Sequence, residues 1–298
     1  MAQIAIAVKY TTPGLKKRLE DSLLSFRNAG YNVSVGETKI DQWPHFLCEL
    51  QGDGVKNDGS TDILFRRCLA ESLAEFVLQE QVTHYLDEIF GHYYFYFSRH
   101  EREQILALAK KNYESEQIKH DSGQVYSEVQ TRLKDYLGQN GYVNLHGFTL
   151  FRLRAWLNYL RKNVDKAVDD FLMEKEYQEF IKLLKYFVAL QEPKINQVHV
   201  TLDEDEHVQL LDHQLKPIER AQQGIVWDGY DSVSDEEDQL VSLLITVAPH
   251  QVVMHKQVYT LFPKAVDTLK HVFENRVTLC KRCKLCQKES KNLTLKGK

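Results

Sequence analysis

The spacing of apolar residues in the first 60 residues predicts alternating strands and helices. Ile4 to Val8 is a β-prone run that is typical of a buried strand. Thr12-Pro13 is a helix-start signal, and apolar residues then recur at helical spacing until Gly30, which supplies a stop. Two later runs, Tyr31 to Val35 and Phe46 to Leu50, are expected to be strands. The apolar helical positions are Leu15, Leu19, Leu23 and Phe26.

From residue 61 to about residue 190 the apolar pattern is helical. One stripe runs from Leu69 to Ile89, and Gly91 interrupts it before the aromatic run Tyr93 to Phe97. The most strongly patterned stretch is Phe148 to Leu190, where one helical face stays apolar for many turns. Pro193 ends it, because proline cannot continue the hydrogen-bond pattern of a helix.

The last third of the chain has shorter apolar runs. Val198 to Leu202 and His207 to Leu211 flank an acidic turn and predict a β-hairpin. Ser234 and Glu237 have the spacing of a capping box before a helix at Leu240 to Val247. A strand, a helix and a strand are expected to follow, at Gln251 to His255, Phe262 to Phe273 and Arg276 to Cys280. The order β-β-α-β-α-β predicts a compact domain with a mixed sheet.

These patterns together predict an α+β protein. It has a small N-terminal α/β region, a helical middle, a C-terminal α/β domain with a mixed sheet, and a basic tail. The expected boundaries are residues 1–60, 61–192, 193–287 and 288–298.

Composition narrows the class of protein. Of the 298 residues, 43% are apolar and 27% are charged, which excludes a fibrous or wholly disordered chain. A net charge of −4 excludes a uniformly basic surface for nucleic acid. The longest strongly apolar run, Leu240 to Ala248, is far below the roughly 20 residues of a membrane-spanning helix. The first eight residues lack the features of a signal peptide. We therefore expect a cytoplasmic protein without a membrane span, whose five cysteines are reduced.

Charge is unevenly distributed along the chain. Thr201 to Leu240 holds twelve acidic and two basic residues, whereas Arg276 to Lys298 holds eight basic and one acidic residue. Such blocks are typical of a solvated acidic loop and a basic tail. The alternative is that the basic tail contacts phosphate groups of a nucleic acid.

Three closely spaced cysteines form the strongest chemical signal. Cys280, Cys283 and Cys286 are separated by two residues each, a spacing that lets their thiolates converge on one metal ion. Basic neighbours, namely Lys281, Arg282 and Lys284, are expected to lower the pKa of these thiols. Redox-active thiols and thiols without a metal are the alternatives.

A structural zinc site needs a fourth ligand. Position 290 is Ser, so the fourth cysteine of a ferredoxin-type iron–sulfur sequence is absent. We favour zinc over an iron–sulfur cluster, because structural zinc sites accept mixed cysteine and histidine ligands. The candidates for the fourth ligand are Cys48, Cys68, His255, His271 and a residue of another chain.

Two other groups of residues have competing interpretations. Glu174, Glu176 and Glu179 could hold a metal or transfer protons, but ion pairs with Arg152, Arg154, Lys175 or Lys182 are the expectation. The aromatic run Tyr93 to Phe97 is expected to pack in the core, with base stacking as the alternative.

One long segment resembles a known family. Val164 to Gln191, followed by Glu192-Pro193 and preceded by Gly147 to Arg154, resembles the YtxC family of sporulation proteins from endospore-forming bacteria. The resemblance covers nearly the whole chain. It implies a cytoplasmic protein tied to spore formation and implies no enzymatic activity, so it supplies no catalytic or cofactor-binding residues.

We therefore expect a non-enzymatic factor that binds a protein partner, or a nucleic acid through its basic tail, and that carries a C-terminal metal knuckle. The alternative is a metal-dependent enzyme with a site between the helical middle and the C-terminal domain. An enzyme needs a concave site, whereas a binding protein needs an exposed charged or apolar surface.

Overall fold

The computed structural model describes residues 2–10, 14–41, 43–52, 59–119, 122–193, 195–203, 207–218, 233–281, 283 and 286. The chain forms two compact units, Met1–Leu172 and Met173–Lys298, and the long helix α8 (Arg154–Leu190) contributes residues to both. Each unit combines helices with a sheet of its own, which confirms the predicted α+β class.

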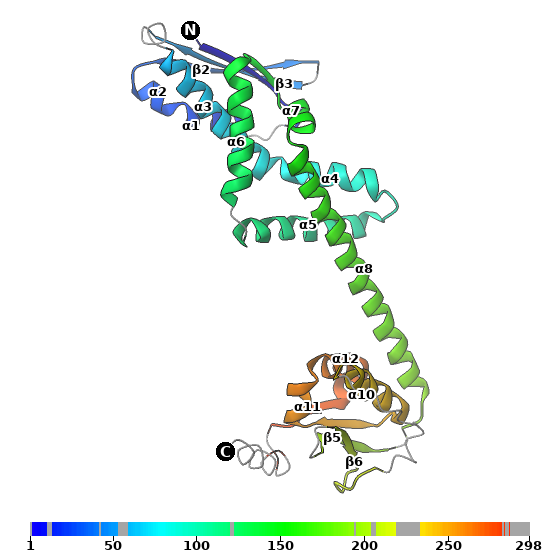
Figure 1. Ribbon diagram of the computed structural model, residues 1–298. Helices are drawn as coiled ribbons and strands as arrows, with labels where there is room; N and C mark the ends of the chain where they lie inside the picture. Colours follow the sequence, from blue (N-terminus) through cyan, green and yellow to red (C-terminus); the bar gives the residue numbers. More distant parts are fainter. Residues whose placement is uncertain are drawn as a thin grey trace, which may run out of the picture. The chain divides into compact units, whose positions relative to one another are not determined.

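The first unit is built on a four-stranded sheet of order β2-β3-β1-β4 (Figure 1). Three of its strands were expected from the sequence, and they pair antiparallel. The fourth strand, β4, comes from the helical stretch and pairs parallel with β1. Its three residues are too few to give a periodic signal in the sequence. The strands are β1 (Ala2–Ala7), β2 (Asn32–Ile40), β3 (Trp43–Gln51) and β4 (Tyr142–Asn144).

Helices cover the sheet of the first unit and extend beyond it. Helix α3 is central, because it packs against β1, α1 and α6 and buries Phe65, Leu69 and Leu73 completely. Gly30 follows α2 with φ = 87°, a left-handed conformation that explains the predicted stop. The helices are α1 (Leu15–Ser22), α2 (Leu24–Asn28), α3 (Ser60–Glu75), the π-helical turn η2 (Phe76–Glu80), α4 (Val82–Tyr93), α5 (Arg99–Lys119), α6 (Ser122–Gln139) and α7 (Leu145–Arg152).

The aromatic run between α4 and α5 divides between core and surface. The ring of Phe97 packs edge-on against Phe171, and the hydroxyl of Tyr94 donates to Asp165 at 2.7 Å. Tyr93, Phe95 and Tyr96 are instead 42%, 80% and 65% exposed. The expectation that the whole run packs in the core is therefore wrong for these three rings.

The expected ion pairs of Arg152 and Arg154 do not form. Both arginines are exposed, and neither makes an ion pair within the described residues. The guanidinium of Arg152 instead lies 5.2 Å from the ring centroid of Tyr136. The prediction failed because one continuous helix, α8, separates Arg154 from Glu174 by about 30 Å at 1.5 Å per residue.

The second unit has a four-stranded sheet of order β6-β5-β7-β8. The hairpin β5–β6 is antiparallel, whereas β5–β7 and β7–β8 are parallel, so the predicted mixed sheet is confirmed. Figure 1 shows α10, α11 and α12 together on one side of this sheet. The elements are β5 (Gln197–Leu202), β6 (Val208–Leu211), α10 (Val233–Val247), β7 (Gln251–Met254), α11 (Lys256–Leu261), α12 (Pro263–Phe273), the 3₁₀ turn η3 (Glu274–Arg276) and β8 (Val277–Leu279).

The start of α10 differs from the capping-box prediction. The helix begins at Val233, so Ser234 lies inside its first turn rather than at the capping position. The preceding acidic residues, Asp228 and Asp231, lie outside the described residues, as does the basic tail 288–298.

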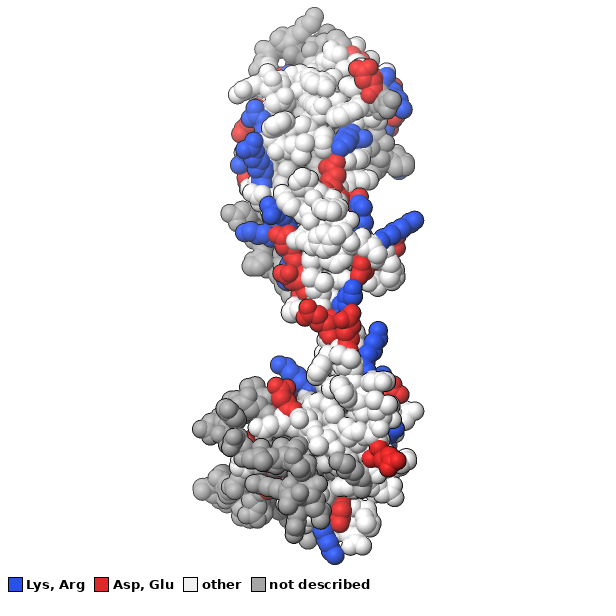
Figure 2. All heavy atoms as spheres, turned by 90° about the vertical axis from the view of Figure 1, so that its right-hand side faces the viewer, with Lys and Arg blue, Asp and Glu red and all other residues white. Residues whose placement is uncertain are grey.

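The described surface mixes charges of both signs. On the face shown in Figure 2, Lys and Arg side chains lie among Asp and Glu side chains, separated by uncharged areas. Among the described helices, opposite charges also pair within one helix, as in Arg67–Glu71 and Arg132–Glu128. On the face shown in Figure 2 the described charges are thus mixed in sign rather than gathered into one basic surface.

The junction of β4 and α7 provides a test of the first unit. The side chain of Asn144 caps α7 by accepting a hydrogen bond from the backbone N–H of Gly147 at 2.9 Å. We expect Asn144→Ala to lower the free energy of unfolding by about 1 kcal/mol, because that N–H loses its acceptor. Asn144→Asp keeps an acceptor and is the matched control, and urea titration measures both. Equal stability of the Ala variant and the wild type would contradict the cap.

Candidate metal centre

Two neighbouring parallel strands bring the first two candidate ligands together. His255 directly follows β7 and Cys280 directly follows β8, and the register pairs Met254 with Leu279. The backbone N–H of Cys280 donates to the carbonyl of Met254 at 2.9 Å, which continues the pairing of the strands. Because both strands run in the same direction, both residues lie at the carboxyl ends of the strands, on the same side of the sheet.

His255 is held rigidly in place. Its backbone N–H donates to the carbonyl of Val200 at 3.0 Å, and its side chain is 2% exposed. Its backbone is extended, and it precedes the first residue of α11. The imidazole is therefore fixed between β5 and the segment that follows β8.

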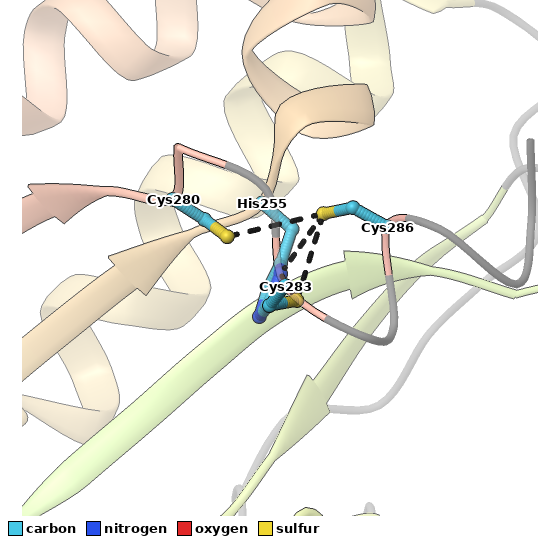
Figure 3. Close-up of side chains that lie close together, drawn as sticks. All are labelled: His255, Cys280, Cys283 and Cys286. Atoms are coloured by element: carbon cyan, nitrogen blue, oxygen red, sulfur yellow. Dashed lines mark hydrogen bonds between the residues drawn. The ribbon is translucent and has the colours of Figure 1, made fainter.

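The other two cysteines complete a compact cluster (Figure 3). Nδ1 of His255 lies 3.4 Å from Sγ of Cys283 and 3.4 Å from Sγ of Cys286. Sγ of Cys286 lies 3.8 Å from Sγ of Cys283 and 4.0 Å from Sγ of Cys280. All four potential ligand atoms lie within 4.8 Å of one another, and no disulfide joins the cysteines.

These four spacings are close to four of the six edges of a tetrahedron around one zinc ion. With zinc–sulfur bonds of about 2.3 Å and a zinc–nitrogen bond of about 2.0 Å, the ligand atoms stand about 3.8 Å apart for S···S and about 3.5 Å for N···S. A disulfide would instead bring two sulfurs to about 2.05 Å. The cluster therefore has the geometry of a Cys₃His metal site.

The protonation of the cluster differs from the sequence-based expectation. The pKa of the Cys280 thiol is raised to about 11, first by burial and then by the neighbouring thiols of Cys283 and Cys286. The expected lowering by basic neighbours is wrong for this thiol, since the one such neighbour described, Lys281, is exposed to solvent. Burial also lowers the pKa of His255, and the neighbouring His199 lowers it further. Without a cation Cys280 and His255 thus favour their uncharged forms, and a divalent ion would reverse this preference for the thiol.

The structure selects among the proposed fourth ligands. His255 lies in the cluster, whereas Cys48 is buried in the middle of β3 and Cys68 lies on α3, both in the first unit. His271 is exposed on α12, and its Nδ1 bonds to the carbonyl of Asp267. The sequence named His255 among the candidates but could not single it out, because the pairing of β7 with β8 that brings it to Cys280 is set by the sheet topology.

The acidic candidates do not form a site. Glu174, Glu176 and Glu179 are exposed on α8, and Glu174 accepts a hydrogen bond from Gln178 at 2.8 Å. Within the described ranges, the Cys₃His cluster is the one group of three or more potential ligands close enough to hold a metal ion.

The fold and the site define an α+β protein whose second unit carries a Cys₃His cluster at the edge of a mixed sheet. The chain belongs to the YtxC-like family, whose model matches residues 67–278. It is 27% identical over 226 residues to the Bacillus subtilis (strain 168) protein named "Uncharacterized protein YtxC", covering 72% of this chain and 76% of that protein. No solved structure matches the chain. No helix in the described residues is long and apolar enough to cross a membrane.

Proposed function

We propose that this chain is a non-enzymatic sporulation protein that binds a partner and carries a structural zinc ion in its second unit. The zinc is held by His255, Cys280, Cys283 and Cys286. The observation that carries the proposal is the tetrahedral spacing of their four ligand atoms. The chain belongs to the YtxC-like family, and the proposed link to spore formation rests on the resemblance to the YtxC family of sporulation proteins.

The ligand set favours zinc over an iron–sulfur cluster. Three sulfurs and one imidazole nitrogen are a common structural zinc combination. Iron–sulfur clusters most often take four cysteines, or two cysteines and two histidines in the Rieske type.

The same set favours a structural role over catalysis. Catalytic zinc keeps one position open for water or substrate, whereas four protein ligands close the shell. A hollow of about 760 Å³ lies between α8, α10 and α12, and none of the four ligands lines it. Zinc would instead link two parts of the second unit. The three cysteines would attach the segment that follows β8, and His255 would attach the sheet. The zinc would thereby fix the point from which the basic tail continues.

Exposed apolar side chains on α8 support a protein partner. Large apolar residues occupy solvent-exposed positions along its second half, where a helix of a protein without partners would carry polar ones. These residues are Met173 (60% exposed), Phe180 (50%), Leu183 (58%), Phe187 (54%) and Leu190 (65%). A nucleic-acid partner would instead depend on the basic residues that follow Arg276.

Zinc binding is expected to release about three protons per chain at neutral pH, because thiols bind metal as thiolates. Protons are released rather than taken up because the raised pKa of Cys280 keeps that thiol protonated in the metal-free chain at neutral pH. Affinity should therefore fall as pH decreases and protons compete with zinc. Calorimetry in two buffers of different ionisation enthalpy counts the protons, and anaerobic purification without an affinity tag should give one zinc per chain. Iron in place of zinc, or binding without proton release, would overturn the proposal.

A further inference from the structure

His199 lies directly behind the candidate metal ligand. It is on β5, next to β7, and its Nδ1 lies 3.2 Å from Nε2 of His255. The two rings are tilted by 32°, with centroids 5.4 Å apart. His199 is half-buried, whereas His255 is fully buried.

The two nitrogens of His255 face different neighbours. Nδ1 faces the sulfurs of Cys283 and Cys286 at 3.4 Å, and Nε2 faces His199. A neutral imidazole that binds metal through Nδ1 carries its proton on Nε2. This buried N–H needs an acceptor, because an unpaired donor in a protein interior is unfavourable.

We propose that His199 is the positioning residue of the zinc centre. Its Nδ1 accepts the hydrogen bond from Nε2–H of His255. This bond holds His255 in the tautomer that presents a bare Nδ1 to the metal and fixes the angle of the ring. His199 then carries its own proton on Nε2. The inference rests on the proposed zinc centre and adds to it a residue outside the four ligands.

The main chain of β5 supports the same geometry. Val200 is the residue after His199, and its carbonyl accepts a hydrogen bond of 3.0 Å from the backbone N–H of His255. Backbone and side chain of His255 are thus both bonded to adjacent residues of one strand. Histidine ligands of metals commonly donate their second N–H in this way, and loss of the acceptor typically weakens binding 10- to 100-fold.

The test compares three variants in full-length protein by competition for zinc with a chromophoric chelator. His199→Ala removes the acceptor and should raise the dissociation constant for zinc about 10- to 100-fold. His199→Asn can place an amide oxygen near the position of Nδ1, so it should restore binding close to that of the wild type. His271→Ala, an exposed histidine of the same unit, is the control and should bind as the wild type does.

Imidazole ¹H–¹⁵N spectra of the zinc-loaded wild type provide a second readout that does not depend on any variant folding. We expect the proton of His255 on Nε2 and protected from exchange with solvent. A proton on Nδ1, wild-type affinity in His199→Ala, or no rescue by His199→Asn would overturn the role of His199. A wild-type chain that binds no zinc would instead overturn the zinc centre itself, so the two failures are distinguishable.

Discussion

Cys283→Ser is expected to abolish stoichiometric zinc binding and to lower the melting temperature of the second unit. Sγ of Cys283 lies 3.4 Å from Nδ1 of His255 and 3.8 Å from Sγ of Cys286, so its loss opens the tetrahedron. Structural zinc sites contribute about 10–16 kcal/mol of binding free energy in small domains, and this energy is coupled to folding. Elemental analysis and calorimetric melting measure the two effects.

The matched control is Cys68→Ser. Cys68 is also a free, partly buried thiol, but it lies on α3 in the first unit. The Cys68→Ser substitution should leave the zinc content unchanged. Two results would refute the structural role of Cys283. The Cys283→Ser variant could keep one zinc per chain, or it could have the melting temperature of the wild type after both have been prepared with zinc.

Ile181→Ala is expected to lower the free energy of unfolding of the second unit by about 2–5 kcal/mol. Ile181 lies on the face of α8 that packs into the core of that unit, and it is 4% exposed. Truncation removes buried methyl and methylene groups and leaves a cavity that the surrounding side chains fill only in part.

Leu183→Ala, two positions further along the same helix, is the control. Leu183 is 58% exposed, and exposed substitutions usually change stability by less than about 0.5 kcal/mol. Urea titrations of the two variants should therefore differ clearly in midpoint. Similar losses for both would show that the face of α8 around Leu183 is also covered, which would weaken the argument for a protein partner.

The elements with long, regular patterns could be predicted from the sequence. The hairpin β5–β6 and the strands β1 and β3 follow from β-prone runs bounded by turn residues. Helix α12 follows from its apolar spacing and from Pro263 at its first position. In each case local preference and burial agree, so the sequence alone was sufficient.

Short or tertiary features could not be predicted. Strand β4 has three residues and exists because β1 offers it an unpaired edge. Helix α11 has six residues, too few for a periodic pattern. The long stretch that ends at Leu190 before Pro193 was predicted, but the interruption at Leu153, which separates α7 from α8, was not, because no proline or glycine marks it.

The candidate site was predictable in part. The spacing of Cys280, Cys283 and Cys286 indicated a metal site, because two-residue gaps let thiolates converge. His255 is 25 residues before Cys280 and reaches the cluster through the parallel pairing of β7 with β8. That pairing depends on sheet topology, which no local motif specifies. His199 was missed for the same reason, since it meets His255 across the pairing of β5 with β7.

X-ray absorption at the zinc edge of the untagged, anaerobically purified protein tests the central claim most directly. The account predicts one zinc per chain, with three sulfur neighbours at about 2.3 Å and one nitrogen neighbour at about 2.0 Å. The sulfurs belong to Cys280, Cys283 and Cys286, and the nitrogen is Nδ1 of His255. A first shell of oxygen and nitrogen atoms without sulfur, or a protein that contains no zinc, would contradict it.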